Sequence, residues 1–235
     1  MSDFNNYHQL RGNDINNISY TFPKYLLKEF GNNKDVKILD IGCGNGSILY
    51  ALKREGYSNL FGIDLDDDAL EVARKNGILC ENQDALFFFP KEKYDIVYMS
   101  HVLEHLPKEQ VISFLSHINN NILTEEGKFI VRVPNAQSNT NCYWAYEDFT
   151  HNTLFTAGSL DYVLKAAGFK KIDFLDVNGM SDSTFIGKII KTPLLMMYKF
   201  NQWFWNHVTG SAYHSASKVI YTWELKAVAY KHNND

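Results

Sequence analysis

The sequence predicts an α/β fold in which a mostly parallel sheet is covered by helices on both faces. Short apolar runs alternate with helical patterns along most of the chain. These runs show little period-2 alternation, as is typical of parallel strands that are buried on both sides. A glycine-rich turn joins the first run to a helical pattern, and in such sheets the carboxyl ends of the strands carry ligand sites. The 235 residues, 45% of them apolar, suffice for one full core.

The predicted elements follow in order along the chain. Strands are expected at residues 37–41, 60–64, 78–80, 94–99, 128–133, 170–177 and 218–230. Helices are expected at residues 23–30, 47–55, 68–75, 107–121 and 160–167. Pro23 and Pro107 favour helix starts, Asp66 or Asp67 can cap the third helix, and glycines favour the stops. We therefore expect an N-terminal arm and lid helix over residues 1–31 and one domain over residues 32–235.

The glycine-rich turn reads Asp40-Ile-Gly42-Cys43-Gly44-Asn-Gly46. Its spacing lacks the third glycine of the dinucleotide fingerprint, and no P-loop lysine follows. An acid at the end of the strand would repel a pyrophosphate and suits a cation. The turn therefore argues against a nicotinamide oxidoreductase and for a cationic ligand.

Polar residues also follow the next three predicted strands. Asp64 ends the second strand, 22 residues after Gly42, where a carboxylate can accept hydrogen bonds from both ribose hydroxyls. Asp84 follows the third strand, and Ser100 ends the fourth. Because parallel strands end at one edge of the sheet, these marks predict a single site.

This order of marks resembles class I S-adenosylmethionine (AdoMet) dependent methyltransferases over residues 36–178. The resemblance implies AdoMet as cofactor and a Rossmann-like, mostly parallel seven-stranded sheet with an antiparallel strand near residues 218–230. It also implies that Asp84 meets the adenine. The implied cofactor-binding residues are Asp40, Gly42, Cys43, Gly44, Asp64, Leu65, Asp84, Ala85 and Ser100.

A later segment, from Asp148-Phe-Thr-His151 to Ser159-Leu160, resembles bacterial methyltransferases of sugars and cell-surface glycans. That resemblance implies methylation of a small-molecule or glycan-type acceptor at oxygen, in surface polysaccharide biosynthesis. Two alternatives stay open: an N-methyltransferase of a small metabolite, and a non-catalytic AdoMet-binding module.

A hydroxyl acceptor must lose a proton, and histidine is suited to accept it near neutral pH. We predict His151 as the base, with His101 or His105 in support. A purely structural role for each of them is the competing interpretation. We assign no metal, although His101 and His105 together with Glu104, Asp148 or His151 could hold a divalent ion.

Aromatic residues and one amide are expected on the acceptor side. Asn135 follows the fifth strand and is a candidate polar contact. The candidate aromatics are Tyr143, Trp144, Tyr146, Phe149 and Phe155, with Tyr7, Tyr20 and Tyr25 in an N-terminal lid. For any single aromatic, simply closing the pocket is the preferred interpretation.

An insertion is expected at about residues 180–217, and its residues 185–208 are apolar and aromatic with interspersed lysines. We expect this stretch to pack on the domain and shape the acceptor pocket. A dimer face and a position on a membrane surface are the alternatives.

The remaining features restrict partners and location. A net charge of −4 gives no footprint for nucleic acid, and the three widely spaced cysteines form no disulfide framework. There is no signal peptide pattern and no stretch of about 20 apolar residues that could span a bilayer. We therefore expect a cytoplasmic enzyme, with homodimerisation left open.

Overall fold

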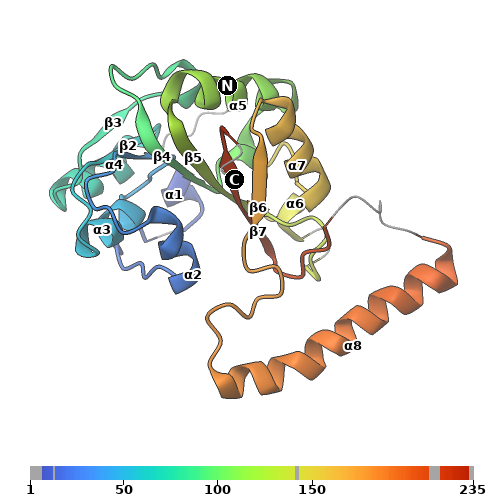
Figure 1. Ribbon diagram of the computed structural model, residues 1–235. Helices are drawn as coiled ribbons and strands as arrows, with labels where there is room; N and C mark the ends of the chain where they lie inside the picture. The colour runs from blue at the N-terminus through green and yellow to red at the C-terminus, as the bar shows by residue number, and fades with distance from the viewer. Residues whose placement is uncertain (1–6, 13, 141–142, 212–217, 233–235) are drawn as a thin grey trace.

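A seven-stranded sheet forms the centre of the protein, in the order β3-β2-β1-β4-β5-β7-β6 (Figure 1). The computed structural model describes residues 7–12, 14–140, 143–211 and 218–232. The strands are β1 (Ile38–Ile41), β2 (Leu60–Asp64), β3 (Cys80–Asn82), β4 (Tyr94–Ser100), β5 (Leu123–Pro134), β6 (Lys171–Phe174) and β7 (Glu224–Tyr230). Only β7 runs against its neighbours, β5 and β6. The predicted fold class is therefore confirmed.

Helices cover both faces of this sheet. One face carries α2 (Lys24–Leu27) with the 3₁₀ turn η1 (Lys28–Phe30), α3 (Ser47–Arg54) and α4 (Asp67–Lys75), and the other carries α5 (Val111–His117) and α7 (Ala157–Ala166). Within β1, Ile38 packs on the face covered by α2, α3 and α4, whereas Leu39 and Ile41 pack on the face covered by α5 and α7. This alternation buries both faces of a central strand, as the unbroken apolar runs predict.

Several element ends differ from their predicted positions. β3 begins two residues late, because its pairing with β2 begins where Cys80 meets Gly62. β7 begins at Glu224 rather than at residue 218, and β5 starts five residues early, at Leu123. The predicted helix over residues 107–121 is a 3₁₀ turn (Lys108–Gln110), then α5, then a π-helical turn (Ile118–Ile122). Pairing with other strands sets the ends of β3, β5 and β7.

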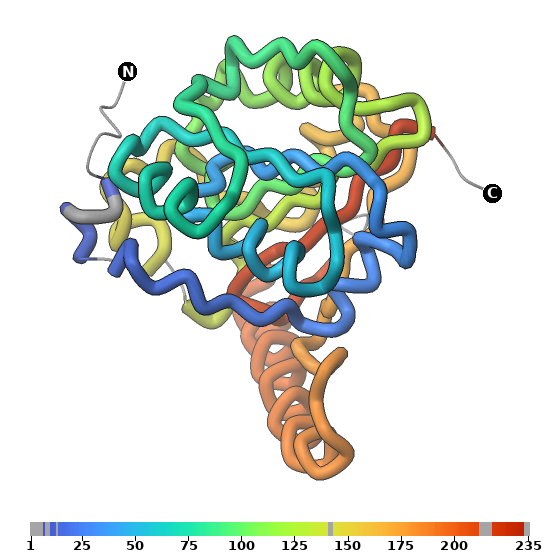
Figure 2. Tube along the Cα trace, turned by 90° about the vertical axis from the view of Figure 1, so that its left-hand side faces the viewer, coloured from blue at the N-terminus to red at the C-terminus, as the bar shows by residue number. Residues whose placement is uncertain are grey.

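The expected insertion contains one long helix, α8 (Phe185–Thr209), that extends away from the sheet and its covering helices (Figures 1 and 2). None of its residues is buried. The expectation that this stretch packs into the domain and shapes the acceptor pocket is therefore wrong for the described residues: α8 meets the domain through exposed or partly exposed side chains such as Lys191 and Tyr198. Residues 212–217 of the insertion and 1–6 of the N-terminal arm lie outside the described part of the chain.

Candidate active site

Two neighbouring cavities open at the carboxyl edge of the parallel strands. The larger has a volume of about 440 Å³ and the smaller about 200 Å³, and both are lined by Gly42 and Ser100. All nine predicted cofactor residues line one or both of them. The larger takes Gly42, Asp64, Leu65, Asp84, Ala85 and Ser100, and the smaller takes Asp40, Gly42, Cys43, Gly44 and Ser100.

The glycine-rich turn closes tightly between β1 and α3. Gly42 has φ +74°, and a Cβ there would lie 2.2 Å from a methyl carbon of Val102. Only glycine fits without displacing that side chain. The backbone N–H of Gly44 donates to Oδ2 of Asp64 (2.7 Å), and Oδ1 of Asp64 accepts from the amides of Leu65 (2.7 Å) and Asp66 (2.9 Å). Asp64 therefore fixes the turn as well as lining the cavity.

The contacts of Asp64, Asp66 and Asp84 show which of these acids cap a helix. Asp66 is the N-cap of α4 and accepts from the amide of Ala69 (3.1 Å). Asp84 caps the 3₁₀ turn at Ala85–Phe87 through the amide of Leu86 (2.9 Å) while also lining the larger cavity. Asp66 therefore caps α4, whereas Asp64 lines the larger cavity.

Asp40 is a buried acid at the inner wall of the smaller cavity. Its side chain is 1% exposed, and Oδ2 has no hydrogen-bond partner among the described residues. Burial, with repulsion from Asp64, raises the pKa of Asp40 to about 8. A buried carboxyl of this kind is stabilised by a cation bound beside it. The cavity therefore fits the α-ammonium end of AdoMet.

His101 lies at the start of the loop after β4, with φ 56°. Its Nε2 contacts Glu224 (2.8 Å) and its Nδ1 contacts Glu104 (3.2 Å), and its ring stacks on Trp223. Burial acts to lower the pKa of His101, but the hydrogen bonds to the two glutamates outweigh it and raise the pKa to about 9. His101 is therefore a cation near neutral pH and cannot accept a proton.

His105 is held by a chain of hydrogen bonds that fixes its tautomer. The hydroxyl of Thr150 donates to Asp148 (2.6 Å), so it must accept from Nδ1 of His105 (2.9 Å). Nε2 of His105 then carries the lone pair. Burial and the nearby His151 lower the pKa of His105, so the ring is neutral near pH 7.

Asp148 connects the N-terminal arm to this chain. It accepts from Tyr7 (2.6 Å) and pairs with Arg11 (2.8 Å). Burial acts to raise the pKa of Asp148, but hydrogen bonds from Thr150 and Tyr7 outweigh it and lower the pKa to about 2. The ionised carboxylate of Asp148 therefore holds Tyr7 and Arg11 of the N-terminal arm close to His105.

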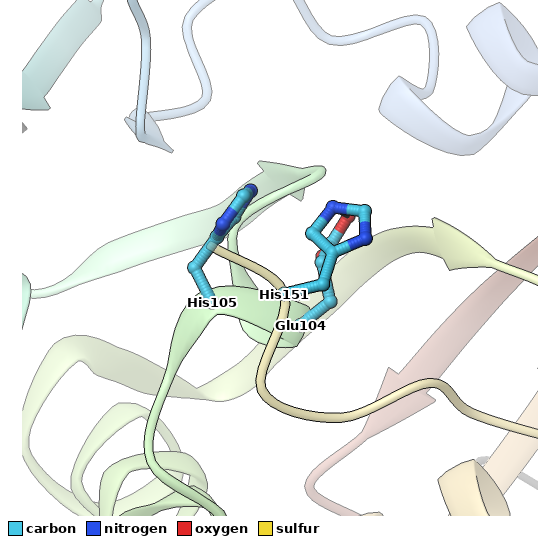
Figure 3. Close-up of side chains that lie close together, drawn as sticks. All are labelled: Glu104, His105 and His151. Atoms are coloured by element: carbon cyan, nitrogen blue, oxygen red, sulfur yellow. Dashed lines mark ion pairs between the residues drawn. The ribbon is translucent and has the colours of Figure 1, made fainter. Parts of the chain in front are cut away.

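His151 lies beside Glu104 and His105 (Figure 3). Its Nδ1 donates to the carbonyl of Trp144 (2.6 Å), which leaves Nε2 facing Glu104 (3.9 Å) and Asp148 (3.8 Å). Glu104 is fully buried, and its Oε2 has no hydrogen-bond partner among the described residues. The pair thus combines an imidazole with a carboxylate that can stabilise its protonated form.

The same three side chains also offer a candidate cation site. Ligand atoms of Glu104, His105 and His151 all lie within 4.8 Å of one another. Both histidines donate their Nδ1 proton to an oxygen, as histidines that bind metals through Nε2 commonly do. Glu104, His105 and His151 could therefore hold a divalent ion, which is the alternative to the prediction that the site contains no metal.

Of the other residues predicted on the acceptor side, some line the larger cavity and others do not. Trp144 lines the larger cavity, as does Tyr7 of the expected lid. Phe155 is buried in the core, Phe149 is fully exposed, and Asn135 is buried, donating to backbone carbonyls of Ile220 and Thr222. Asn135 thus supports the chain before β7 and does not line either cavity.

Several residues of the site were not predicted from the sequence, among them Arg11, Arg132, Trp223 and Glu224. Arg11 and Trp223 line the larger cavity, while Glu224 and Arg132 form a bidentate ion pair (2.9 and 3.0 Å) behind His101. None of them belongs to a local motif. Only the sheet brings Glu224, 123 residues along the chain, to His101.

Fold and site together define a Rossmann-like domain with two adjoining cavities, one lined by the buried acid Asp40 and the other by a histidine cluster. A family model described as "Methyltransferase domain" matches residues 15–173. The chain therefore belongs to this methyltransferase family, and its domain is an AdoMet-dependent methyltransferase domain.

Individual relatives agree with this family. The ubiquinone biosynthesis O-methyltransferase of Hydrogenovibrio crunogenus is 33% identical over 90 residues, which cover 35% of this chain and 37% of that protein. A SAM-dependent methyltransferase from Archaeoglobus fulgidus matches with a TM-score of 0.61 at 21% identity, covering 89% of this chain and all of that one. The magnesium protoporphyrin IX methyltransferase of Synechocystis, solved with S-adenosylhomocysteine, matches with a TM-score of 0.60 at 13% identity, covering 97% and 96%.

These relatives restrict the earlier expectations. The chain spans little more than a third of the length of the ubiquinone enzyme that it matches. The resemblance to sugar and glycan methyltransferases is not supported by the comparisons. The acceptor is therefore not given by the family.

Proposed function

We propose that this protein transfers the methyl group of AdoMet to a hydroxyl of a small, ring-containing acceptor. The observation that carries the proposal is one cavity lined both by Asp64 and Asp84 and by His105 and His151. Donor and acceptor can therefore meet inside a single cavity. The name of the Hydrogenovibrio relative, an O-methyltransferase, supports oxygen as the acceptor atom.

Each end of the site has its own task. Asp40 neutralises the α-ammonium of the cofactor, Asp64 accepts the ribose hydroxyls, and Asp84 receives the adenine amine. AdoMet supplies a methyl group already activated on a sulfonium. The protein's main contribution is then alignment, together with removal of water by the arm that carries Tyr7 and Arg11.

The acceptor hydroxyl loses its proton to Nε2 of His151, and Glu104 stabilises the resulting imidazolium. His101, already a cation, orients Glu104 from its other side. His105 stays neutral beside His151, with ring centroids 4.7 Å apart. The indoles of Trp144 and Trp223, whose ring centroids lie 5.2 Å apart, form an apolar wall of the cavity against which an acceptor ring can pack.

Activity is tested by following S-adenosylhomocysteine release from AdoMet with a panel of small acceptors. The panel contains phenols, sugars and amines of similar size. We expect turnover with hydroxyl-bearing rings, and mass spectrometry of the product to place the methyl on oxygen. Methylation at nitrogen would favour the amine alternative, and binding of AdoMet without turnover on any acceptor would favour a non-catalytic module. A glycan-type acceptor stays within this proposal and is identified by turnover on sugars alone.

Asp64→Ala is expected to weaken S-adenosylhomocysteine binding at least tenfold. Hydrogen bonds to a charged group contribute about 1.5–3 kcal/mol, and the carboxylate also holds the turn at Gly44. Calorimetric titration measures the affinity, with Asp68→Ala as the matched control, because Asp68 is an exposed acid of α4. Wild-type affinity in Asp64→Ala would contradict the ribose role.

A further inference from the structure

Helix α8 turns its polar side toward the domain and its apolar side away from it. Lys188, Lys191, Leu195, Lys199, Gln202 and Asn206 recur at spacings of three and four, and so share one side of the helix. Nζ of Lys191 donates to the carbonyl of Gly179 (3.2 Å), and Nζ of Lys199 lies 4.9 Å from the centre of the Tyr221 ring. This side therefore faces the loops of the domain.

The opposite side of α8 is mainly apolar and is interrupted by Asn201. Ile186, Ile190, Met197, Phe200, Phe204 and Val208 recur at helical spacing and are between 43% and 68% exposed. Trp203 and Trp205 border this side and are 55% and 54% exposed. A surface helix of a globular protein normally has the reverse arrangement, with its apolar side against the core. The outward side therefore requires an apolar environment outside the domain.

The charge of α8 indicates which environment fits. The helix carries three lysines and no Asp or Glu, although the whole chain has a net charge of −4. Lysine stems can reach around a helix while their ammonium groups stay at a polar boundary. Lysines on one side and Trp, Phe and Ile on the other are typical of helices that lie in the headgroup region of anionic membranes.

We propose that α8 lies flat on the surface of an anionic membrane, with its apolar side in the acyl boundary. Pairing with α8 of a second copy is less suitable, since a second α8, with three lysines and no acid, offers no complementary charge. In the described part of the chain, no helix meets the length and hydropathy needed to cross a bilayer. The binding that we infer is therefore peripheral.

This position would bring the active site close to the membrane surface. The ring of Tyr221 packs against Tyr198 of α8, with centroids 5.7 Å apart. Two residues later, Trp223 lines the larger cavity. The segment from Tyr221 to Trp223 thus contacts α8 at one end and lines the larger cavity at the other.

The full chain should sediment with vesicles of phosphatidylcholine and phosphatidylglycerol but only weakly with phosphatidylcholine alone. High salt should reduce the binding, because the Debye length falls from about 10 Å at 0.1 M to about 3 Å at 1 M. Met197→Glu/Phe204→Glu should weaken binding to the anionic vesicles at least tenfold, since it adds negative charge at the apolar boundary. Leu79→Glu/Tyr162→Glu, which changes exposed apolar residues away from α8, is the matched control and should bind like the wild type.

Sedimentation velocity and S-adenosylhomocysteine titration complete the test. Unchanged cofactor affinity in Met197→Glu/Phe204→Glu shows that the domain is folded and separates this proposal from the proposed function. Absence of vesicle binding by the wild type would overturn the proposal. So would a wild-type dimer that becomes a monomer in the double variant without any binding to vesicles, because the apolar side would then belong to a second copy.

Discussion

His151→Ala is expected to lower turnover by about 10²–10⁴ while S-adenosylhomocysteine affinity stays within about twofold of wild type. The variant removes the imidazole whose Nε2 faces Glu104 (3.9 Å), and it changes none of the predicted cofactor residues. Initial rates on an acceptor identified by the panel measure the first quantity, and calorimetry the second. Loss of rate without loss of cofactor binding is the signature of a residue that acts on the acceptor.

His151→Asn separates proton transfer from positioning. Its amide can keep the hydrogen bond that Nδ1 of His151 makes to the carbonyl of Trp144, but it cannot accept the proton. It should therefore be as slow as His151→Ala, whereas His207→Ala, on the exposed helix α8, should have wild-type rates. An active His151→Asn would make His151 a positioning residue. Activity lost to a chelator and restored by a divalent ion would make Glu104, His105 and His151 metal ligands instead.

The parts of the fold that the sequence predicted are those determined by local chemistry. Buried apolar runs, the glycine turn at Gly42 and the cap at Asp66 each depend on residues close in the chain. The ends of β3 and β7 were misplaced because pairing with a distant strand determines them. Asn135 was assigned to the acceptor by its position after a strand, whereas its amide supports the segment before β7.

The residues of the candidate active site were likewise predicted where the signal is local and missed where distant segments meet. The predicted cofactor residues lie at consecutive strand ends, and one motif with one spacing rule was enough to select residues that all line the two cavities. The charge state of His101 depends on Glu224, which no local pattern connects to it. The apolar composition of α8 was visible in the sequence, but the side that it turns to the domain follows only from contacts such as Tyr198 with Tyr221.

Asp40→Asn is expected to stabilise the folded protein at alkaline pH while it weakens cofactor binding. The pKa of Asp40 rises from its ordinary value near 4 to about 8 on folding, so the native state keeps a proton that the unfolded chain releases. Wild-type stability should therefore fall as the pH rises from about 4 to 8. Asparagine resembles the neutral acid and does not titrate, so the variant should lack this contribution.

Thermal unfolding of both proteins between about pH 4 and pH 9 measures this difference. The two melting temperatures should be similar at the acid end, and that of Asp40→Asn should be higher at the alkaline end. Parallel curves would show that Asp40 does not titrate in this range in the folded state. Asp84→Asn, at an acid that lines the same site but is only half-buried, is the control and should follow the wild type.

Binding gives the second half of the test, because a cation beside Asp40 favours its ionised form. Wild-type protein at about pH 7 should then release a proton when S-adenosylhomocysteine binds. The release appears in calorimetry as a binding enthalpy that depends on the ionisation enthalpy of the buffer. Asp40→Asn should lose that dependence and bind at least tenfold more weakly, since a hydrogen bond to a charged group contributes about 1.5–3 kcal/mol. A variant that is more stable but binds as tightly as the wild type would show that Asp40 does not contact the α-ammonium group. Stability gained and affinity lost in the same variant would mean that the protein maintains a destabilising buried acid because the cofactor requires it.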